Sequence, residues 1–328
     1  MEGRSPAATA AAAAYEAFAR RELAGYSAAY ERICLAVAAD DELLDRLSTL
    51  PVPKQQPNLL LGAVRWLDGP IGAYEPFREF VLGHWDRVVA VVLARRTQTN
   101  EANRCAALLP LLAKVHAETG RPLALIEVGT SAGLCLLPDR YGYHYSDHHV
   151  GDPAAAVQLT CAVDGPVPIP AAIPPIAWRA GIDINPLDVT DPGDMRWLEC
   201  LVWPEQTDRR DRLRAAVATA RREPPRIVAG DLNESIEKLV AEAPADATTV
   251  VFHTAVLAYL DDDGRAAFAA RMATLPVRWI SNEAPHVFPE IAGRLTAPPP
   301  PGPYLTVLAL DGHPYAYGAP HGQRLYWL

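Results

Sequence analysis

The chain has 328 residues, of which 50% are hydrophobic and 21% are charged. This composition is typical of a globular protein with a packed core and excludes a disordered or fibrous chain. The net charge of -9 at pH 7 argues against a nucleic-acid-binding protein, which usually presents a basic face. The length is sufficient for two domains or for one large α/β domain with an extension.

The cysteines and the apolar runs indicate where the protein resides. Five cysteines are scattered without a CxxC pair, so neither a disulfide framework nor a thiolate zinc site is indicated. No run reaches the roughly 18 apolar residues that a membrane-spanning helix needs. We expect a soluble, cytoplasmic protein without a membrane or nucleic-acid partner, whose oligomeric state the sequence does not specify.

The first 118 residues are predicted to form an all-helical domain. Apolar residues recur there at three-to-four spacing in segments separated by Pro or Gly. The predicted helices are Ala13–Leu23, Ser27–Ala38, Asp41–Leu47, Asn58–Leu67, Phe77–Arg95 and Asn100–Glu118.

Residues 119–328 change to alternating strands and helices, which predicts a second, α/β domain. The predicted strands are Leu123–Val128, Ile176–Ile184, Arg226–Ala229, Thr248–His253, Val277–Ser281, Tyr304–Ala309 and Gln323–Leu328. Helices between the earlier strands indicate a mostly parallel sheet covered on both faces. The short connection at residues 312–322 predicts that the last two strands form an antiparallel hairpin.

An inserted segment at residues 141–163 is predicted to be a two-stranded hairpin. Tyr141, Tyr143 and Tyr145 alternate in its first half, and Val157 and Leu159 alternate in its second half. Two interpretations stay open: the segment covers a ligand site, or it has no chemical role.

The segment LALIEVGTSAGL at residues 123–134 carries the most information about function. A buried strand ends at Glu127, and small residues lead into a helix predicted to open between Thr130 and Gly133. Such a turn presents free backbone N–H groups and the positive end of a helix dipole to a ligand.

Later strands also end in polar residues, at the edge where open parallel sheets bind ligands. Asp183 follows the second strand, where a carboxylate can accept hydrogen bonds from both hydroxyls of a ribose. Asp231 follows the third strand and can accept from an exocyclic amine, while Leu232 can pack on the base ring.

These motifs resemble a known enzyme class. The pattern ExGxSxG at residues 127–133, followed by GIDINP at 181–186 and AGDL at 229–232, resembles the class I S-adenosylmethionine-dependent methyltransferases over the C-terminal two-thirds. At finer grain, QTNEANR at residues 98–104, EVGTSAGL, DRYGYHY, WRAGIDINPLDV and FHTAVLAYL resemble the bacterial domain of unknown function DUF2332 over nearly the whole chain.

The methyltransferase resemblance implies a Rossmann-like three-layer sandwich, with a mostly parallel seven-stranded sheet that ends in an antiparallel hairpin. It implies S-adenosylmethionine as the cofactor, with Asp183 binding the ribose and Asp231 the adenine. The amino-acid half would be held by Glu127, Gly129, Thr130, Ser131 and Gly133. Many such enzymes have glycine where this chain has Ser131, which makes close backbone approach to the ligand harder.

Two other functions compete with this interpretation. Gly129 to Gly133 also spells GxSxG, the nucleophile elbow of serine hydrolases. Ser131 would then need a carboxylate such as Asp261 or Asp262 and a histidine, from among His286, His313 and His321. The helical segments upstream argue against that fold. The other alternative is a protein of the same fold that binds its ligand without catalysis.

Within the methyltransferase interpretation, His253 is the candidate general base, since it ends the fourth strand where the transferred methyl group would emerge. The alternative is a structural histidine. The second-rank candidates for contact with a small-molecule substrate are Thr254, Tyr259, Asn282 and Glu283.

The polar segment before the last N-terminal helix suggests further contacts with the ligand. Asn100 is a candidate cap for that helix. Arg104 or Gln98 is expected to reach the cofactor's carboxylate or the substrate, since Arg suits bidentate carboxylate binding. His144, Asp147, His148 and His149 lie close together in sequence, but alternation on a strand separates their side chains, so no metal site is predicted.

Overall fold

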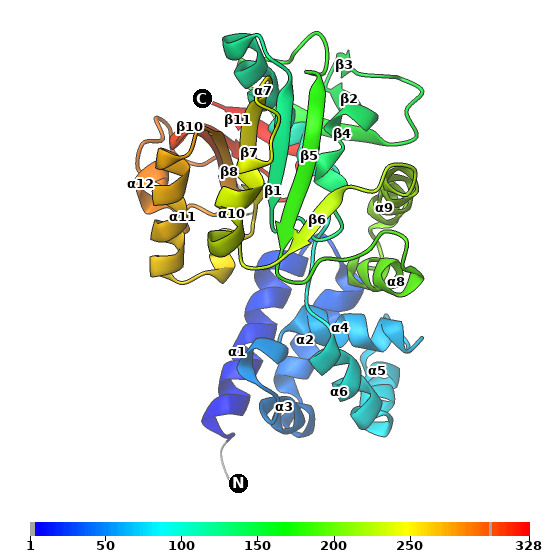
Figure 1. Cartoon of the computed structure of the whole chain (residues 1–328). Helices are drawn as coiled ribbons and strands as arrows, with labels where there is room; N and C mark the ends of the chain where they lie inside the picture. Colours follow the sequence, from blue (N-terminus) through cyan, green and yellow to red (C-terminus); the bar gives the residue numbers. More distant parts are fainter. Residues whose placement is uncertain (1–3, 302–303) are drawn as a thin grey trace. The chain divides into compact units, whose positions relative to one another are not determined.

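The computed structural model describes residues 4–301 and 304–328, which divide into two compact units (Figure 1). One unit contains the residues up to Thr99 and Pro192–Asp211, and the other contains Asn100–Asp191 and Arg212–Leu328. The division differs from the predicted boundary at residue 118. Helix α7 (Arg104–Thr119) packs on strands of the sheet unit, whereas Trp197 lies in the hydrophobic core of the helical unit.

Three helices of the helical unit begin at side-chain caps. The hydroxyls of Ser5 and Ser27 and the carboxylate of Asp40 accept hydrogen bonds from backbone N–H groups in the first turns of these helices. The predicted helix at residues 77–95 is divided at His84. The helices are α1 (Pro6–Phe18, continued by a π-helix at Ala19–Leu23), α2 (Ala28–Ala39), α3 (Asp41–Ser48), α4 (Pro57–Trp66), α5 (Tyr74–Gly83), α6 (Trp85–Ala94) and α8 (Pro192–Leu201).

The sheet unit contains an eleven-stranded, mostly parallel sheet in the order β3-β2-β4-β11-β10-β9-β8-β7-β1-β5-β6. The prediction of seven strands is therefore wrong. The strands are β1 (Leu123–Val128), β2 (Gly142–Tyr145), β3 (His148–Val150), β4 (Gln158–Asp164), β5 (Ile176–Asp183), β6 (Arg226–Ala229), β7 (Thr248–Thr254), β8 (Arg278–Glu283), β9 (Thr306–Leu310), β10 (His313–Gly318) and β11 (Arg324–Trp327).

Side-chain alternation gives the central strands two different faces. One face of β1 and β7, with Val128 and Val251, packs in a core that includes residues of α10 (Leu232–Ala241), α11 (Asp262–Thr274) and α12 (Pro289–Ala292). Helix α7 packs on β4, β7 and β8. The side chains of Glu127 and Thr254 belong to this second face by alternation. Helix α9 (Thr207–Ala220) crosses the boundary between the units.

The end of the sheet is a meander of three antiparallel strands, not a single hairpin. Strand β9 pairs antiparallel with β8, and the turn at Asp311 and Gly312, both with positive φ, reverses the chain into β10. Strand β10 lies within residues 312–322, which were predicted to be a short connection, so this strand was missed. Pro314 lies at an irregularity in the pairing of β10 with β9.

The inserted segment extends the sheet. Strand β2 forms a hairpin with β3, while β4 pairs parallel to β2. The two halves that were predicted to form an antiparallel hairpin are therefore parallel neighbours, and the prediction is wrong on this point. Strand β4 also pairs with β11, which joins the segment to the main sheet.

Candidate ligand site at the carboxyl edge of the sheet

The central strand β1 lies at the point where the chain changes direction across the sheet. After the inserted strands β2, β3 and β4, the chain forms β5 and β6 on one side of β1, and it then returns to form β7 and β8 on the other side. In open α/β sheets, ligands bind outside the carboxyl ends of the strands at such a switch point. The residues that follow β1, β5, β7 and β8 therefore define the candidate site.

The turn after β1 is tightly wound. Gly129, Ser131 and Gly133 have φ of 69°, 53° and 76°. A Cβ atom on Gly129 would lie 2.4 Å from Val256, so glycine is required there for space as well as for conformation. Ser131 has a left-handed backbone conformation, which is unfavourable in free energy for any residue that carries a side chain. The turn thus stores backbone strain at the switch point.

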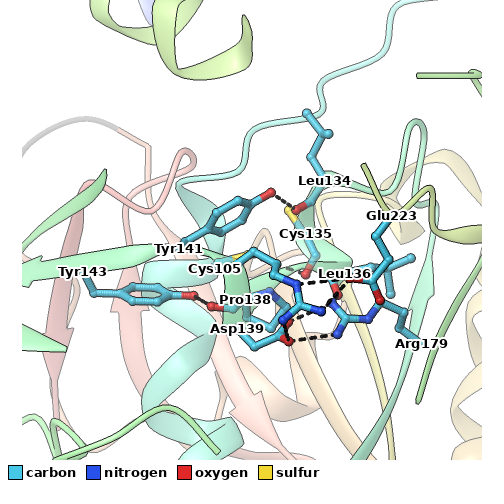
Figure 2. A network of polar contacts seen from close by, with 11 residues as sticks. Cys105, Leu134, Cys135, Leu136, Pro138, Asp139, Tyr141, Tyr143, Arg179 and Glu223 are labelled. Carbon is cyan, nitrogen blue, oxygen red and sulfur yellow. Dashed lines mark hydrogen bonds and ion pairs between the residues drawn. The ribbon is translucent and has the colours of Figure 1, made fainter. Parts of the chain in front are cut away.

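The predicted helix after this turn is absent. Residues 134–136 and 138–140 form single 3₁₀ turns, since Pro138 has no N–H with which to continue a helix back to Leu134. Tyr141 instead donates its hydroxyl to the carbonyl of Leu134, and Tyr143 donates to that of Pro138, each over 2.7 Å (Figure 2). The prediction of a helix dipole over the turn is therefore wrong.

A half-buried ion pair fixes the same segment to the neighbouring strand. Both terminal nitrogens of Arg179 on β5 donate to the carboxylate of Asp139, over 2.7 and 2.9 Å (Figure 2). One of these nitrogens also donates to the carbonyl of Leu136 over 3.0 Å. This bidentate geometry holds the 3₁₀ turns against the sheet and completes the hydrogen bonding that an α-helix would have supplied.

Asp183, predicted to bind a ribose, supports the β1 turn. One carboxylate oxygen accepts from the backbone N–H of Ser131 over 2.7 Å, and the other accepts from that of Asn185 over 2.7 Å. Each oxygen retains a lone pair for one more donor. Asp183 therefore brings the ends of β1 and β5 together and can still accept from a ligand.

Asp231 and Leu232, predicted to bind adenine, form the start of α10. One carboxylate oxygen of Asp231 accepts from the backbone N–H groups of Asn233 and Glu234. Leu232 packs partly against the core beneath the sheet. Both residues follow β6, two strands away from β1.

Glu127 lies buried beneath the turn. Its carboxyl accepts a hydrogen bond from the hydroxyl of Thr130 over 2.6 Å. Burial raises the pKa of Glu127 to about 8, although Thr130 and the nearby Arg104 act in the opposite direction. The group is therefore mainly protonated at neutral pH. The side chain of Thr130 in turn fills the space over Gly181.

The polar segment before α7 organises the site's backbone. The amide of Asn100 donates to the carbonyl of Thr130 over 3.2 Å and accepts from the N–H of Leu134 over 3.1 Å. Asn100 does not cap a helix, since α7 begins only at Arg104. Asn103 bonds instead to both backbone groups of Thr160 on β4.

Arg104 lies at the start of α7 with its guanidinium buried. It donates to the carbonyl and the hydroxyl of Thr254 over 2.9 and 3.1 Å and to the carbonyl of Pro320 over 3.0 Å. All of these acceptors are neutral. Gln98 belongs to the helical unit and is half-buried there.

His253 is completely enclosed, with 0% exposure. Its Nδ1 lies 2.7 Å from Glu283, and its Nε2 accepts a hydrogen bond from Trp279 over 2.9 Å. Alternation places the ring on the face of the sheet opposite Thr254, beside Phe268. Neither ring nitrogen is free to remove a substrate proton, so this geometry favours the structural interpretation.

The other second-rank candidates lie in different environments. Burial alone raises the pKa of Glu283, but hydrogen bonds from His253, Val256 and Leu257 outweigh it and hold the pKa below the ordinary value. Asn282 is 1% exposed, and its side-chain oxygen has no hydrogen-bond partner. Tyr259 is 76% exposed.

The hydroxyl of Ser131 is buried and has no hydrogen-bond partner among the residues that the structure describes. No histidine therefore activates it. Asp261 caps α11, and Asp262 pairs with Arg265. The two carboxylates proposed for a hydrolase thus form interactions within the first turns of α11.

No three His, Cys, Asp or Glu side chains within residues 4–301 and 304–328 are grouped to hold a metal ion. Over the same residues, no helix combines the length and the apolar character that crossing a bilayer requires.

Comparison with known families assigns the chain to a protein family. A family described as "Uncharacterized protein conserved in bacteria (DUF2332)" matches residues 12–327. The chain belongs to the DUF2332 family. A comparison with curated proteins finds no match. The DUF2332 match spans every residue of the candidate site but attaches no activity to it.

Sequence reasoning missed part of the site in this DUF2332 protein. Trp279 and the hydroxyls of Tyr141 and Tyr143 were not recognised as partners of site residues. One usable signal was present for His253: it lies two residues after the buried Val251, so alternation places both on the core face.

Proposed function

We propose that this DUF2332 protein is a class I type S-adenosylmethionine-dependent methyltransferase with a small-molecule acceptor. One observation carries the proposal: at the switch point, the strained turn after β1 is hydrogen-bonded to the carboxylate that ends β5. This arrangement suits a ligand that has an amino-acid part at β1 and a ribose at β5.

The residues present fit such a cofactor. The buried hydroxyl of Ser131 has no partner and can bond to the amino-acid half, above the carboxyl of Glu127. Asp183 would accept from the ribose hydroxyls, and Asp231 and Leu232 would bind the adenine. When bound, the cofactor supplies an electrophilic methyl group.

The protein's contribution to the transfer would be to position the two reactants. Holding reacting atoms in line supplies a large part of the rate enhancement without a base. Because both nitrogens of His253 are hydrogen-bonded, the acceptor's nucleophile would reach the site already deprotonated. Arg104 and Thr254 lie on the acceptor side of the turn.

Calorimetric titration with S-adenosylmethionine and S-adenosylhomocysteine tests the proposal. We expect micromolar binding that is lost in Asp183→Ala and weakened in Asp183→Asn, which keeps the shape but not the charge. Asp263→Ala, on an exposed residue in the first turn of α11, should bind like the wild type. No binding of either nucleoside by the folded wild-type protein would overturn the proposal.

A serine hydrolase is the second candidate, favoured by the left-handed conformation of Ser131 in a GxSxG turn. The missing base and the missing helix count against it. Labelling by a fluorophosphonate probe that disappears in Ser131→Ala would favour the hydrolase. Nucleoside binding without any methyl transfer to a panel of acceptors would instead favour a non-catalytic binding protein.

A further inference from the structure

Arg104 is a buried cation that forms no ion pair within residues 4–301 and 304–328. Its side chain is among the buried polar groups, at 7% exposure, and its three hydrogen bonds all go to neutral oxygens of Thr254 and Pro320. Buried charges are normally paired, because an uncompensated charge is costly to remove from water. Burial raises the pKa of Glu127 to about 8 although the charge of Arg104 lowers it, so Glu127 is mainly protonated at neutral pH. Within the described residues, the hydrogen bonds of Arg104 therefore include no carboxylate.

A second buried polar group on the same face is also unsatisfied. Asn282 is the register partner of Thr254 on the neighbouring strand, so its side chain lies on the α7 face beside the residue that binds Arg104. Asn282 is 1% exposed, and its side-chain oxygen receives no hydrogen bond from any described residue. Leaving such an oxygen unpaired costs stability unless a ligand completes it.

The two groups lie on one side of the switch point. The proposed cofactor residues lie at or just beyond the ends of β1, β5 and β6, whereas Thr254 ends β7 and Asn282 is the penultimate residue of β8. A cofactor spread over the first three strands leaves the edge of β7 and β8 to the second substrate. Arg104 reaches this edge from α7.

We propose that the methyl acceptor is a small carboxylic acid, whose carboxylate pairs with Arg104 and whose hydrogen-bond donor, a hydroxyl or amine, bonds to Asn282. The inference rests on the proposed function for the position of the cofactor. The acceptor's carboxylate supplies the missing counterion, and its donor satisfies the unpaired oxygen. The same contacts would select against neutral analogues, because those would leave Arg104 unpaired.

Ligand-observed NMR tests the site with 4-hydroxybenzoate as the probe and 4-hydroxybenzamide as its neutral counterpart, with S-adenosylhomocysteine present. We expect the carboxylate to bind at least about tenfold more tightly than the amide, as a charged hydrogen-bonded pair predicts. Arg104→Gln should abolish this preference. Arg294→Gln, on an exposed arginine that bonds only to the carbonyl of Gly312, should retain it.

Asn282→Asp keeps the test decisive if Arg104→Gln does not fold. This change places a carboxylate beside Thr254, which accepts hydrogen bonds from Arg104, so the melting temperature of the ligand-free protein should rise and carboxylate binding should be lost. A variant with a lower melting temperature and unchanged carboxylate binding overturns the inference.

The affinity for the nucleosides separates this inference from the proposed function. If S-adenosylhomocysteine binds but the wild type shows no preference for the carboxylate probe, the inference fails and the proposed function stands. 5′-Methylthioadenosine lacks the carboxylate of S-adenosylhomocysteine. The acceptor assignment therefore also fails if Arg104→Gln weakens the binding of S-adenosylhomocysteine but leaves the binding of 5′-methylthioadenosine unchanged. If the carboxylate binds but no nucleoside does, the proposed function fails and the anion site remains.

Discussion

The indole N–H of Trp279 donates a hydrogen bond to Nε2 of His253 over 2.9 Å. Since an indole nitrogen only donates, Nε2 must be the accepting nitrogen of a neutral ring. The ring proton is then on Nδ1 and is donated to Glu283. The Trp279 bond thus fixes both the tautomer and the uncharged state of His253.

Trp279→Phe should lower the free energy of unfolding by about 1–3 kcal/mol, because it leaves a buried nitrogen without a donor. Urea unfolding monitored by circular dichroism measures the change. Affinity for S-adenosylhomocysteine should be unaffected, since His253 lies on the far face of the sheet from Thr254. A loss of affinity without a loss of stability would show that His253 belongs to the ligand site after all.

Glu127 should make stability depend on pH. Its pKa is about 8 in the folded protein against an ordinary value of 4.5, so between these values the folded state binds a proton that the unfolded state has released. The contribution of Glu127 is therefore fully present below about pH 4.5 and falls by about 1.4 kcal/mol per pH unit up to about pH 8.

Glu127→Gln removes this titration, so the stability difference between wild type and variant should change in favour of the variant as the pH rises. Unfolding free energies measured at several pH values between 5 and 9, a range chosen to span the titration, give this difference. Parallel curves for the two proteins would mean that Glu127 is ionised in the folded state.

Gly129→Ala should destabilise the protein more than Gly120→Ala. The two glycines have similar φ, 69° and 67°, but a Cβ at Gly129 would lie 2.4 Å from Val256, while a Cβ at Gly120 meets nothing within 4 Å. The change at Gly120 therefore measures conformational strain alone, about 1 kcal/mol. The additional loss of stability at Gly129, measured as a lower melting temperature, reports the contact with Val256. Equal losses of stability in the two variants would contradict this prediction.

Tyr141→Phe should cost about 1 kcal/mol, because the carbonyl of Leu134 loses the hydroxyl that replaces a helical hydrogen bond. Tyr315→Phe is the matched control, since the Tyr315 ring packs against Trp327 and its hydroxyl forms no hydrogen bond within the described residues. Chemical denaturation of both variants measures the difference. Equal stability of the two variants would show that the Tyr141 bond does not hold the 3₁₀ turn.

Local patterns were sufficient to predict the central strands. The bounds of β1 and β6 agree with the prediction, because each is a short apolar run with clear breaks at both ends. Glu127 and Asp183 were found for the same reason: both are polar residues at the ends of such runs. Whether they bind a cofactor stays a prediction.

Features that depend on distant residues could not be predicted in this way. The 3₁₀ turns after Gly133 are held in part by Arg179, which lies on another strand 43 residues after Leu136. The parallel direction of β4 is set by its pairing with β2 and with β11, far along the chain. The environment of Arg104 could not be predicted either, because its hydrogen-bond acceptors, Thr254 and Pro320, lie in segments far from α7 in the sequence.

The pairing of β4 with β11 has a consequence for how the protein folds. The contact between Arg324 and Asp164 closes a loop of 160 residues, and such long closures are slow because their entropy must be lost before the contacts form. Until this closure occurs, β4 and β10 expose backbone edges that can pair with other chains. Refolding yield should therefore fall with protein concentration, and a short peptide that mimics β11 should compete with the native strand for β4.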